Sequence, residues 1–163
     1  MTTTTSIDST TIALRLLAAL LIGSIVGINR ELHEKPAGLR THALVALGSA
    51  VVVLACRQLG TTADHQADAV SRAIQGLVAG IGFLGGGVIL RDAGGGRVQG
   101  LTTAAAIWVT ALFGAACGIG AFQVVGFGVA LMFAVLTVGG AIERLALRLF
   151  HRRSEEDRPT PRE

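Results

Sequence analysis

The chain has 163 residues, of which 51% are hydrophobic and only 15% are charged, whereas soluble domains carry about 25% charged residues. So few charges could not cover the surface of a soluble domain of this size. The composition therefore excludes an ordinary soluble protein and indicates a membrane protein whose main partner is lipid rather than nucleic acid.

The first apolar segment runs from about Thr10 to Ile28 and includes Arg15, whose long side chain we expect to extend outward to the membrane interface. Residues 1–9 lack the basic start of a signal peptide, so we expect them to stay as a short tail. The second segment runs from Leu39 to Cys56. It reaches spanning length only if its first residues are included, which predicts that His42 lies at the membrane interface.

The third segment contains a glycine pattern with two interpretations. Gly80, Gly82 and Gly85 spell G-x-G-x-x-G, which in a soluble protein indicates a phosphate-binding loop. However, no charge interrupts the chain between Arg72 and Arg91, a helical length of roughly 27 Å that suits a bilayer. We therefore predict a membrane span. Whether residues 85–87 only allow helices to touch, or break the helix beside a polar path, stays open at this stage.

Residues 98–142 carry no charge, and as a single helix they would extend roughly 68 Å, more than twice the hydrocarbon thickness. They must therefore fold back, and the glycines at 118 and 120 predict the turn. This gives a fourth span at about Leu101–Cys117 and a fifth at about Phe122–Ile142.

The predicted fold is all-α, a polytopic membrane bundle of five transmembrane helices. Grouping alternate loops places eleven Lys and Arg residues on one side and two on the other. The positive-inside rule then puts the N-terminus outside and the C-terminus in the cytoplasm. We predict an extracytoplasmic tail at 1–9, a membrane domain at 10–143, and a basic, disordered cytoplasmic tail at 144–163.

Glycines recur at four-residue spacing in several spans, which in a membrane lets neighbouring helices approach closely. We predict packing roles for a set of ten: Gly23, Gly27, Gly76, Gly80, Gly82, Gly85, Gly86, Gly87, Gly114 and Gly118. Such an extent of glycine surface also favours self-association. We expect the two cysteines, Cys56 and Cys117, to be buried small hydrophobes.

Three stretches together carry a resemblance. They read K-P-A-G-L-R-T at 35–41, G-I-G-F-L-G-G-G-V at 80–88 and R-V-Q-G-L-T-T-A-A at 97–105, and the match extends to A-C-G-I-G at 116–120. In this order they resemble the signature of the MgtC/SapB family of bacterial inner-membrane proteins. The resemblance covers about residues 16–120. It implies a role in growth at low magnesium and, in several pathogens, survival inside host phagocytes through regulation of other membrane systems.

The chain departs from the family pattern in two places. Asn29 stands where family members typically carry a glutamate. The chain also ends soon after the fifth span, so it resembles the short form without the C-terminal soluble domain. Virulence functions tied to that domain are not carried over.

The residues favour regulation over transport or catalysis. Mg²⁺ prefers carboxylate oxygens, and no Asp or Glu lies in the middle of a span. A cation transporter that uses Asn29, Gln75 and carbonyls freed near Gly85 is the alternative hypothesis. The two membrane-embedded serines have no histidine base, so we predict no enzyme activity, no cofactor and no metal site.

The candidate functional residues lie mostly in the first cytoplasmic loop, where Pro36 and Gly38 shape the chain and basic residues present positive charge. Thr102 and Thr103 have two open interpretations, as caps of the fourth span or as functional groups. We expect Gln75 to bond a neighbouring helix and Trp108 to pack between helices. The set is Asn29, Arg30, Glu31, Lys35, Pro36, Gly38, Arg40, Thr41, Gln75, Arg97, Thr102 and Thr103.

Overall fold

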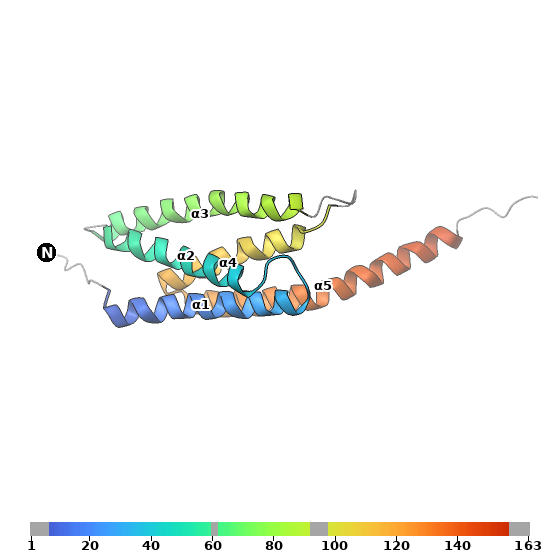
Figure 1. The fold of residues 1–163 in the computed structure, drawn as a ribbon, viewed down its shortest axis with the longest axis horizontal. Helices are drawn as coiled ribbons and strands as arrows, with labels where there is room; N and C mark the ends of the chain where they lie inside the picture. Colours follow the sequence, from blue (N-terminus) through green and yellow to red (C-terminus); the bar gives the residue numbers. More distant parts are fainter. Residues whose placement is uncertain (1–6, 60–61, 92–97, 157–163) are drawn as a thin grey trace, which may run out of the picture. The chain divides into compact units, whose positions relative to one another are not determined.

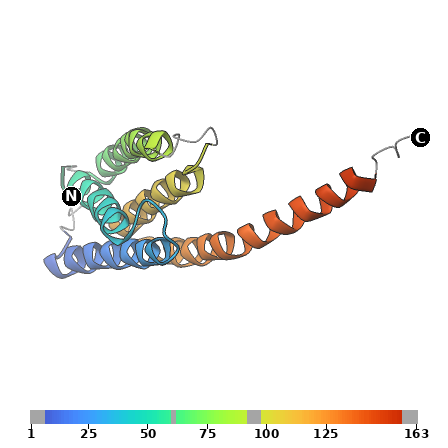
Figure 2. The same cartoon turned by 45° about the vertical axis from the view of Figure 1, so that its right-hand side comes forward.

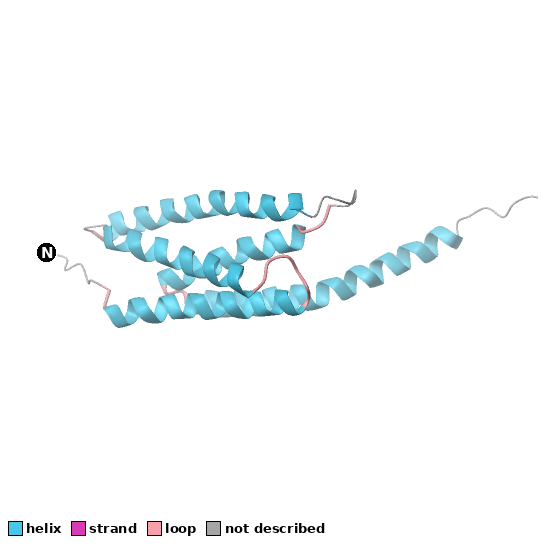
Figure 3. Ribbon diagram, in the orientation of Figure 1, coloured by secondary structure: helices cyan, strands magenta, loops and turns pink. Residues whose placement is uncertain are grey.

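A computed structural model describes residues 7–59, 62–91 and 98–156, all of whose regular structure is helical (Figures 1 and 3). Every helix is long and apolar enough to cross a membrane, which confirms the predicted class and span number for the described part of the chain. In chain order the helices are α1 Ser9–Leu32, α2 Leu39–Leu59, α3 Ala63–Arg91, α4 Leu101–Ile119 and α5 Phe122–Glu156.

Several helices are longer than the uncharged runs that predicted them. α3 begins at Ala63 rather than near Arg72, and α5 continues past Ile142 to Glu156, through much of the segment predicted to be disordered. The physical reason is that charged residues limit only the part of a helix that lies in the hydrocarbon of the membrane. The helix itself continues until a helix-breaking residue stops it. In α5 no proline occurs before residue 159.

The chain divides by its internal contacts into two units, Met1–Val125 and Gly126–Glu163. The first unit contains α1 to α4, and its core lies among α1, α2 and α4 (Figure 2). Small residues dominate that core, including Ala19, Ala46 and Ala50, which are fully buried. Because dispersion contacts and not hydrophobicity hold helices together in lipid, small residues that allow close approach are what such a core needs.

Four of the predicted packing glycines lie at these close approaches. A Cβ added to Gly23 would lie 2.5 Å from the His42 carbonyl oxygen, and one on Gly27 would lie 2.5 Å from Leu39 Cα. On α4, a Cβ on Gly114 would overlap the Ala46 carbonyl oxygen, and one on Gly118 would lie 3.0 Å from the Ala50 oxygen. At Gly23, Gly27 and Gly114 an added side chain would require the backbone to move, and at Gly118 the neighbouring atoms would have to shift slightly.

The contacts fix the directions of the three core helices. Three residues of α2 contact three residues of α4 with the same sequence separation in each pair, so α2 and α4 run parallel. The pairs are His42 with Thr110, Ala46 with Gly114 and Ala50 with Gly118. Contacts from α1 run in the opposite sense, because Arg15 meets Gly118 whereas Arg30 meets Thr103. We call the two ends of this core the Arg30 end and the Arg15 end. The charge rule predicts that the Arg30 end faces the cytoplasm.

α3 runs alongside α2 and α4 (Figures 1 and 2). It is continuous through residues 85–87, so the triple glycine does not break it. A Cβ on Gly85 would lie 3.4 Å from Ala104 Cβ, an ordinary contact. The other predicted packing glycines of α3 face open space among the described residues, with nothing within 4 Å of an added Cβ: Gly76, Gly80, Gly82, Gly86 and Gly87.

Glycines at positive φ bound α4. Gly100 (φ 85°) is its N-cap residue and Gly120 (φ 94°) its C-cap, where the Gly120 N–H donates to the Ala116 and Cys117 carbonyls. The predicted turn after Gly118 is therefore confirmed. The interpretation of Thr102 and Thr103 as caps is wrong, because the N-cap position belongs to Gly100, which has no side chain to donate or accept.

Candidate functional site

The connection between α1 and α2 is a tight loop at the Arg30 end. The Lys35 N–H donates to the Arg30 carbonyl oxygen (3.0 Å), and Glu34 adopts a left-handed conformation with φ 54°. Pro36 follows and cannot continue α1. His33 Nδ1 lies 2.7 Å from the carbonyl oxygen of half-buried Asn29, which further closes the last turn of α1.

Glu31 ties this loop to the start of α2. Its Oε2 accepts a hydrogen bond from the Leu39 N–H at 3.0 Å, so a residue of α1 caps the first turn of α2. A carboxylate at this position satisfies a free N–H and lies favourably at the positive end of the helix dipole. A Cβ on Gly38 would lie 2.9 Å from the same oxygen, so glycine leaves room for the cap.

A cavity of about 500 Å³ opens beside the capped turn. Lys35, Arg40 and Thr41 line it with exposed side chains that form no hydrogen bond or ion pair within the described part of the chain. The cavity thus holds two cations that form no ion pair, beside the Glu31 carboxylate, which keeps its negative charge while it accepts from Leu39. It is lined by Glu31, Lys35, Pro36, Gly38, Leu39, Arg40 and Thr41.

Arg30 lies behind this loop, inside the core. It is 4% exposed, and its Nη2 donates to Thr103 Oγ1 at 2.6 Å. The structure thus brings together two candidates from sequence stretches 73 residues apart. Thr102, the preceding residue of α4, is exposed, and Arg97 lies outside the described residues.

His42 is also a core residue, and it lies in the first turn of α2 at the Arg30 end, while its predicted place at the depth of the membrane interface stays a prediction. It is fully buried, and its Nδ1 lies 2.9 Å from Thr110 Oγ1. The spacing of His42, Ala46 and Ala50 could have indicated this, because residues four apart share one helix face and the other two are small.

The Arg15 end holds a second polar arrangement that the sequence did not reveal. Arg15 Nη1 donates to the Gly118 carbonyl oxygen at 2.9 Å, and Arg57 Nη1 donates to the Ile119 oxygen at 3.0 Å. Both guanidinium groups satisfy the last free carbonyls of α4, where positive charge is favoured. The expectation that Arg15 extends outward to the membrane interface stays a prediction.

Two further residues of the sequence analysis are exposed. Gln75 is exposed, and its Nε2 lies 3.5 Å from Ser71 Oγ on the same helix, so the expected bond to a neighbouring helix is not formed among the described residues. Trp108 is 40% exposed, so most of its surface is covered and the expectation that it packs is confirmed in part.

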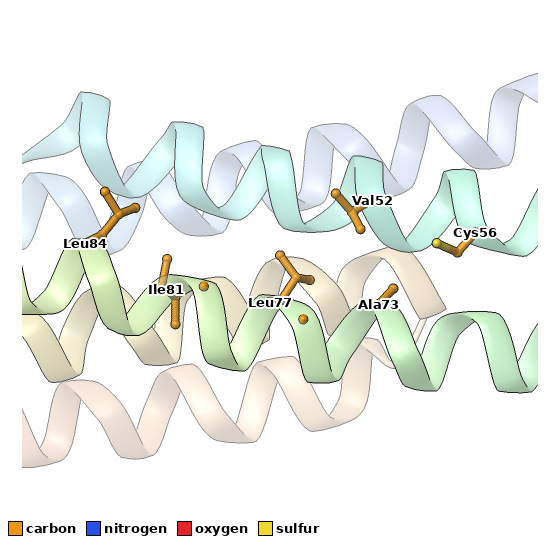
Figure 4. Close-up of a pocket in the computed structure, with 8 residues that line it drawn as sticks. Val52, Cys56, Ala73, Leu77, Ile81 and Leu84 are labelled. Carbon is orange, nitrogen blue, oxygen red and sulfur yellow. The ribbon is translucent and has the colours of Figure 1, made fainter.

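An apolar groove of about 470 Å³ lies between α2 and α3 (Figure 4). Figure 4 shows Val52 and Cys56 of α2 facing Ala73, Leu77, Ile81 and Leu84 of α3, and Gly76 and Gly80 complete the lining. Cys56 is half-buried here, whereas Cys117 is buried in the core as expected, and both thiols are free. The described residues include no group of three His, Cys, Asp or Glu side chains that could hold a metal ion.

With this geometry in place, comparison with known proteins identifies the family. The model of the MgtC family matches residues 16–145. The chain belongs to the MgtC family. The matched region contains most of α1, all of α2 to α4, the bond between Arg30 and Thr103 and the loop between α1 and α2, whereas Arg15 lies just before it.

Relatives of this MgtC-family chain include Protein SrpB from Synechococcus elongatus, 44% identical over 144 residues, which are 83% of this chain and 78% of SrpB. Protein MgtC from Salmonella typhimurium is 46% identical over 110 residues, 68% of this chain and 44% of that protein. The chain thus aligns with less than half the length of MgtC itself. No solved structure matches the chain.

Proposed function

We propose that this MgtC-family protein is a non-enzymatic factor of the bacterial inner membrane that supports growth at low magnesium by regulating membrane protein partners. The family match and the 46% identity with MgtC support the link to magnesium and virulence. The observation that carries the regulatory mechanism is the loop at the Arg30 end, which is rigidly built yet leaves its cations unpaired.

The loop has the properties of a recognition surface. The bond from Leu39 to Glu31 and the bond from Lys35 to the Arg30 carbonyl hold its backbone in one shape. Lys35 and Arg40 carry positive charge on this backbone, beside a cavity of about 500 Å³. Two cations close together on a shaped loop favour a partner with an acidic surface, because electrostatic complementarity selects between partners.

The membrane face of α3 offers a second contact for such a partner. Gly76 and Gly80 face open space and line the apolar groove beside α2. In lipid, bare helix backbone of this kind is favoured at contacts between helices. A transmembrane helix of the regulated protein, or a second copy of this chain, could approach the bare backbone of α3 closely and pack into the apolar groove.

The structure removes one argument for the alternative hypothesis, that the protein is a cation transporter. That hypothesis used carbonyls freed by a break near Gly85, and α3 is continuous through that position. The core at the Arg30 end contains the buried guanidinium group of Arg30, and its positive charge disfavours the passage of a cation.

One pair of measurements tests this proposal. The purified full chain in liposomes is assayed for Mg²⁺ flux, and a strain lacking the gene is grown at low magnesium. We expect growth to fail in the deletion strain, while liposomes with and without protein show the same flux. Mg²⁺ flux that depends on the protein would overturn the regulatory proposal in favour of transport.

A further inference from the structure

The cavity beside the loop between α1 and α2 holds charges of both signs. Lys35 and Arg40 line it with exposed cationic side chains, and Thr41 adds a hydroxyl group. Glu31 lines the same cavity with a carboxylate, which accepts a backbone hydrogen bond at 3.0 Å. Glu34, the other acid of the loop, does not belong to the lining. The lining therefore carries an excess of one positive charge.

The length of α2 places this cavity at the membrane surface. α2 has 21 residues, and at 1.5 Å per residue it is roughly 31 Å long, about the thickness of the hydrocarbon layer. The helix needs its full length to cross, so its first turn, which carries Arg40 and Thr41, lies at the depth of the lipid head groups. The charge rule predicts that this end faces the cytoplasm, where the leaflet contains anionic lipids.

We propose that the cavity binds the phosphate group of an anionic phospholipid of the cytoplasmic leaflet, one whose head group is otherwise uncharged. The Arg40 guanidinium group pairs with two phosphate oxygens, because its planar fork matches their geometry. The Lys35 ammonium group adds a second positive charge from the loop, and the Thr41 hydroxyl group is a further donor. Both cations line one cavity of about 500 Å³, so a single phosphate group can meet both.

The Glu31 carboxylate determines which kind of phosphate fits. The phosphodiester of a phospholipid carries one negative charge, which balances the excess positive charge of the lining. A phosphate monoester carries about −1.5 to −2 at pH 7, and its additional charge is repelled by Glu31. A head group with an ammonium ion is also disfavoured, because its positive charge adds to the excess that is already there. The charges thus favour a lipid such as phosphatidylglycerol over free phosphate.

The proposal names a ligand for the loop on which the proposed function rests. A protein partner with an acidic surface competes with the lipid for Lys35 and Arg40, so the anionic lipid content of the membrane regulates access to the loop. Lipid binding is measured without growth and without a partner. Its absence would therefore overturn the lipid site alone, whereas the growth of the deletion strain tests the proposed function separately.

Native mass spectrometry of the purified full chain in a non-ionic detergent tests the lipid site. The protein is titrated with equal amounts of dioleoylphosphatidylglycerol and dioleoylphosphatidylethanolamine, and we expect it to retain phosphatidylglycerol preferentially. The double change of Lys35→Ala and Arg40→Ala should weaken this binding roughly 30-fold, because each basic residue near an anionic surface contributes about fivefold. Exposed Arg72→Ala on α3 is the control and should leave it unchanged. Glu31→Gln should raise the affinity for dioleoylphosphatidic acid, a monoester, relative to phosphatidylglycerol.

Equal retention of the two lipids by the wild type would overturn the proposal, and this measurement requires no variant to fold. Undiminished preference in the double variant would also overturn it, because the lipid would then bind elsewhere. Unchanged selectivity in Glu31→Gln would refute the charge balance. Displacement of phosphatidylglycerol by inorganic phosphate would assign the cavity to a soluble phosphate. Binding of a polyglutamate peptide through Lys35 and Arg40, without any lipid preference, would assign it to an acidic protein surface instead.

Discussion

The change Gly114→Ala tests whether α2 and α4 approach as closely as the structure describes. An added Cβ would overlap the Ala46 carbonyl oxygen and lie 2.7 Å from both Ala46 C and Ala46 Cα. These atoms are backbone, so no side chain can rotate away to relieve the clash. Overpacking of a core costs about 1–3 kcal/mol, and alanine recovers about 1 kcal/mol in helix propensity over glycine.

Because the clash is with backbone, we expect the upper part of the resulting range, so that Gly114→Ala lowers the free energy of unfolding by up to about 2 kcal/mol, measured by detergent-induced unfolding of the purified protein in mixed micelles. Gly80→Ala on α3 is the matched control, because an added Cβ there meets nothing within 4 Å. The control should be as stable as the wild type or slightly more stable. If Gly114→Ala is no less stable than Gly80→Ala, the close approach of α2 and α4 is refuted.

Three further predictions use the same unfolding measurement. Glu34→Gly should stabilise the protein by about 1 kcal/mol, because residue 34 has a φ of 54°, which glycine adopts without strain; an unchanged or lower stability would contradict the loop geometry. Glu31→Ala should cost about 1 kcal/mol by removing the cap on Leu39, whereas exposed Asp68→Ala should be neutral, and equal effects would argue against the cap. Arg15→Met should cost about 1.5 kcal/mol through loss of the bond to Gly118, and a neutral result would mean that Arg15 does not bond α4.

The membrane spans were predictable from the sequence because hydrocarbon excludes charge. The run between Arg72 and Arg91 had to be a span, and the uncharged run after Arg97 had to fold back at its glycines. Helix ends were less predictable. α3 and α5 extend well beyond their apolar runs, because charged residues such as Asp64 are compatible with helix outside the membrane.

The candidate site was predictable only in part. The loop around Arg40 stood out locally, since its proline, glycine and basic residues lie within a few positions of one another. The buried bonds did not, because Arg30 and Thr103 are 73 residues apart and their meeting depends on the register of α1 against α4. For the same reason sequence spacing could not tell which glycines pack: Gly114 meets α2, whereas Gly80 faces open space.

The most direct test of the regulatory account is growth of the deletion strain at low magnesium when it is complemented with loop variants. The double change of Lys35→Ala and Arg40→Ala removes both unpaired cations of the cavity, and exposed Arg72→Ala on α3 is the matched control. With equal amounts of each protein in the membrane, we predict that the control restores growth and the double variant does not. Full growth with the double variant would contradict the claim that this loop carries the function.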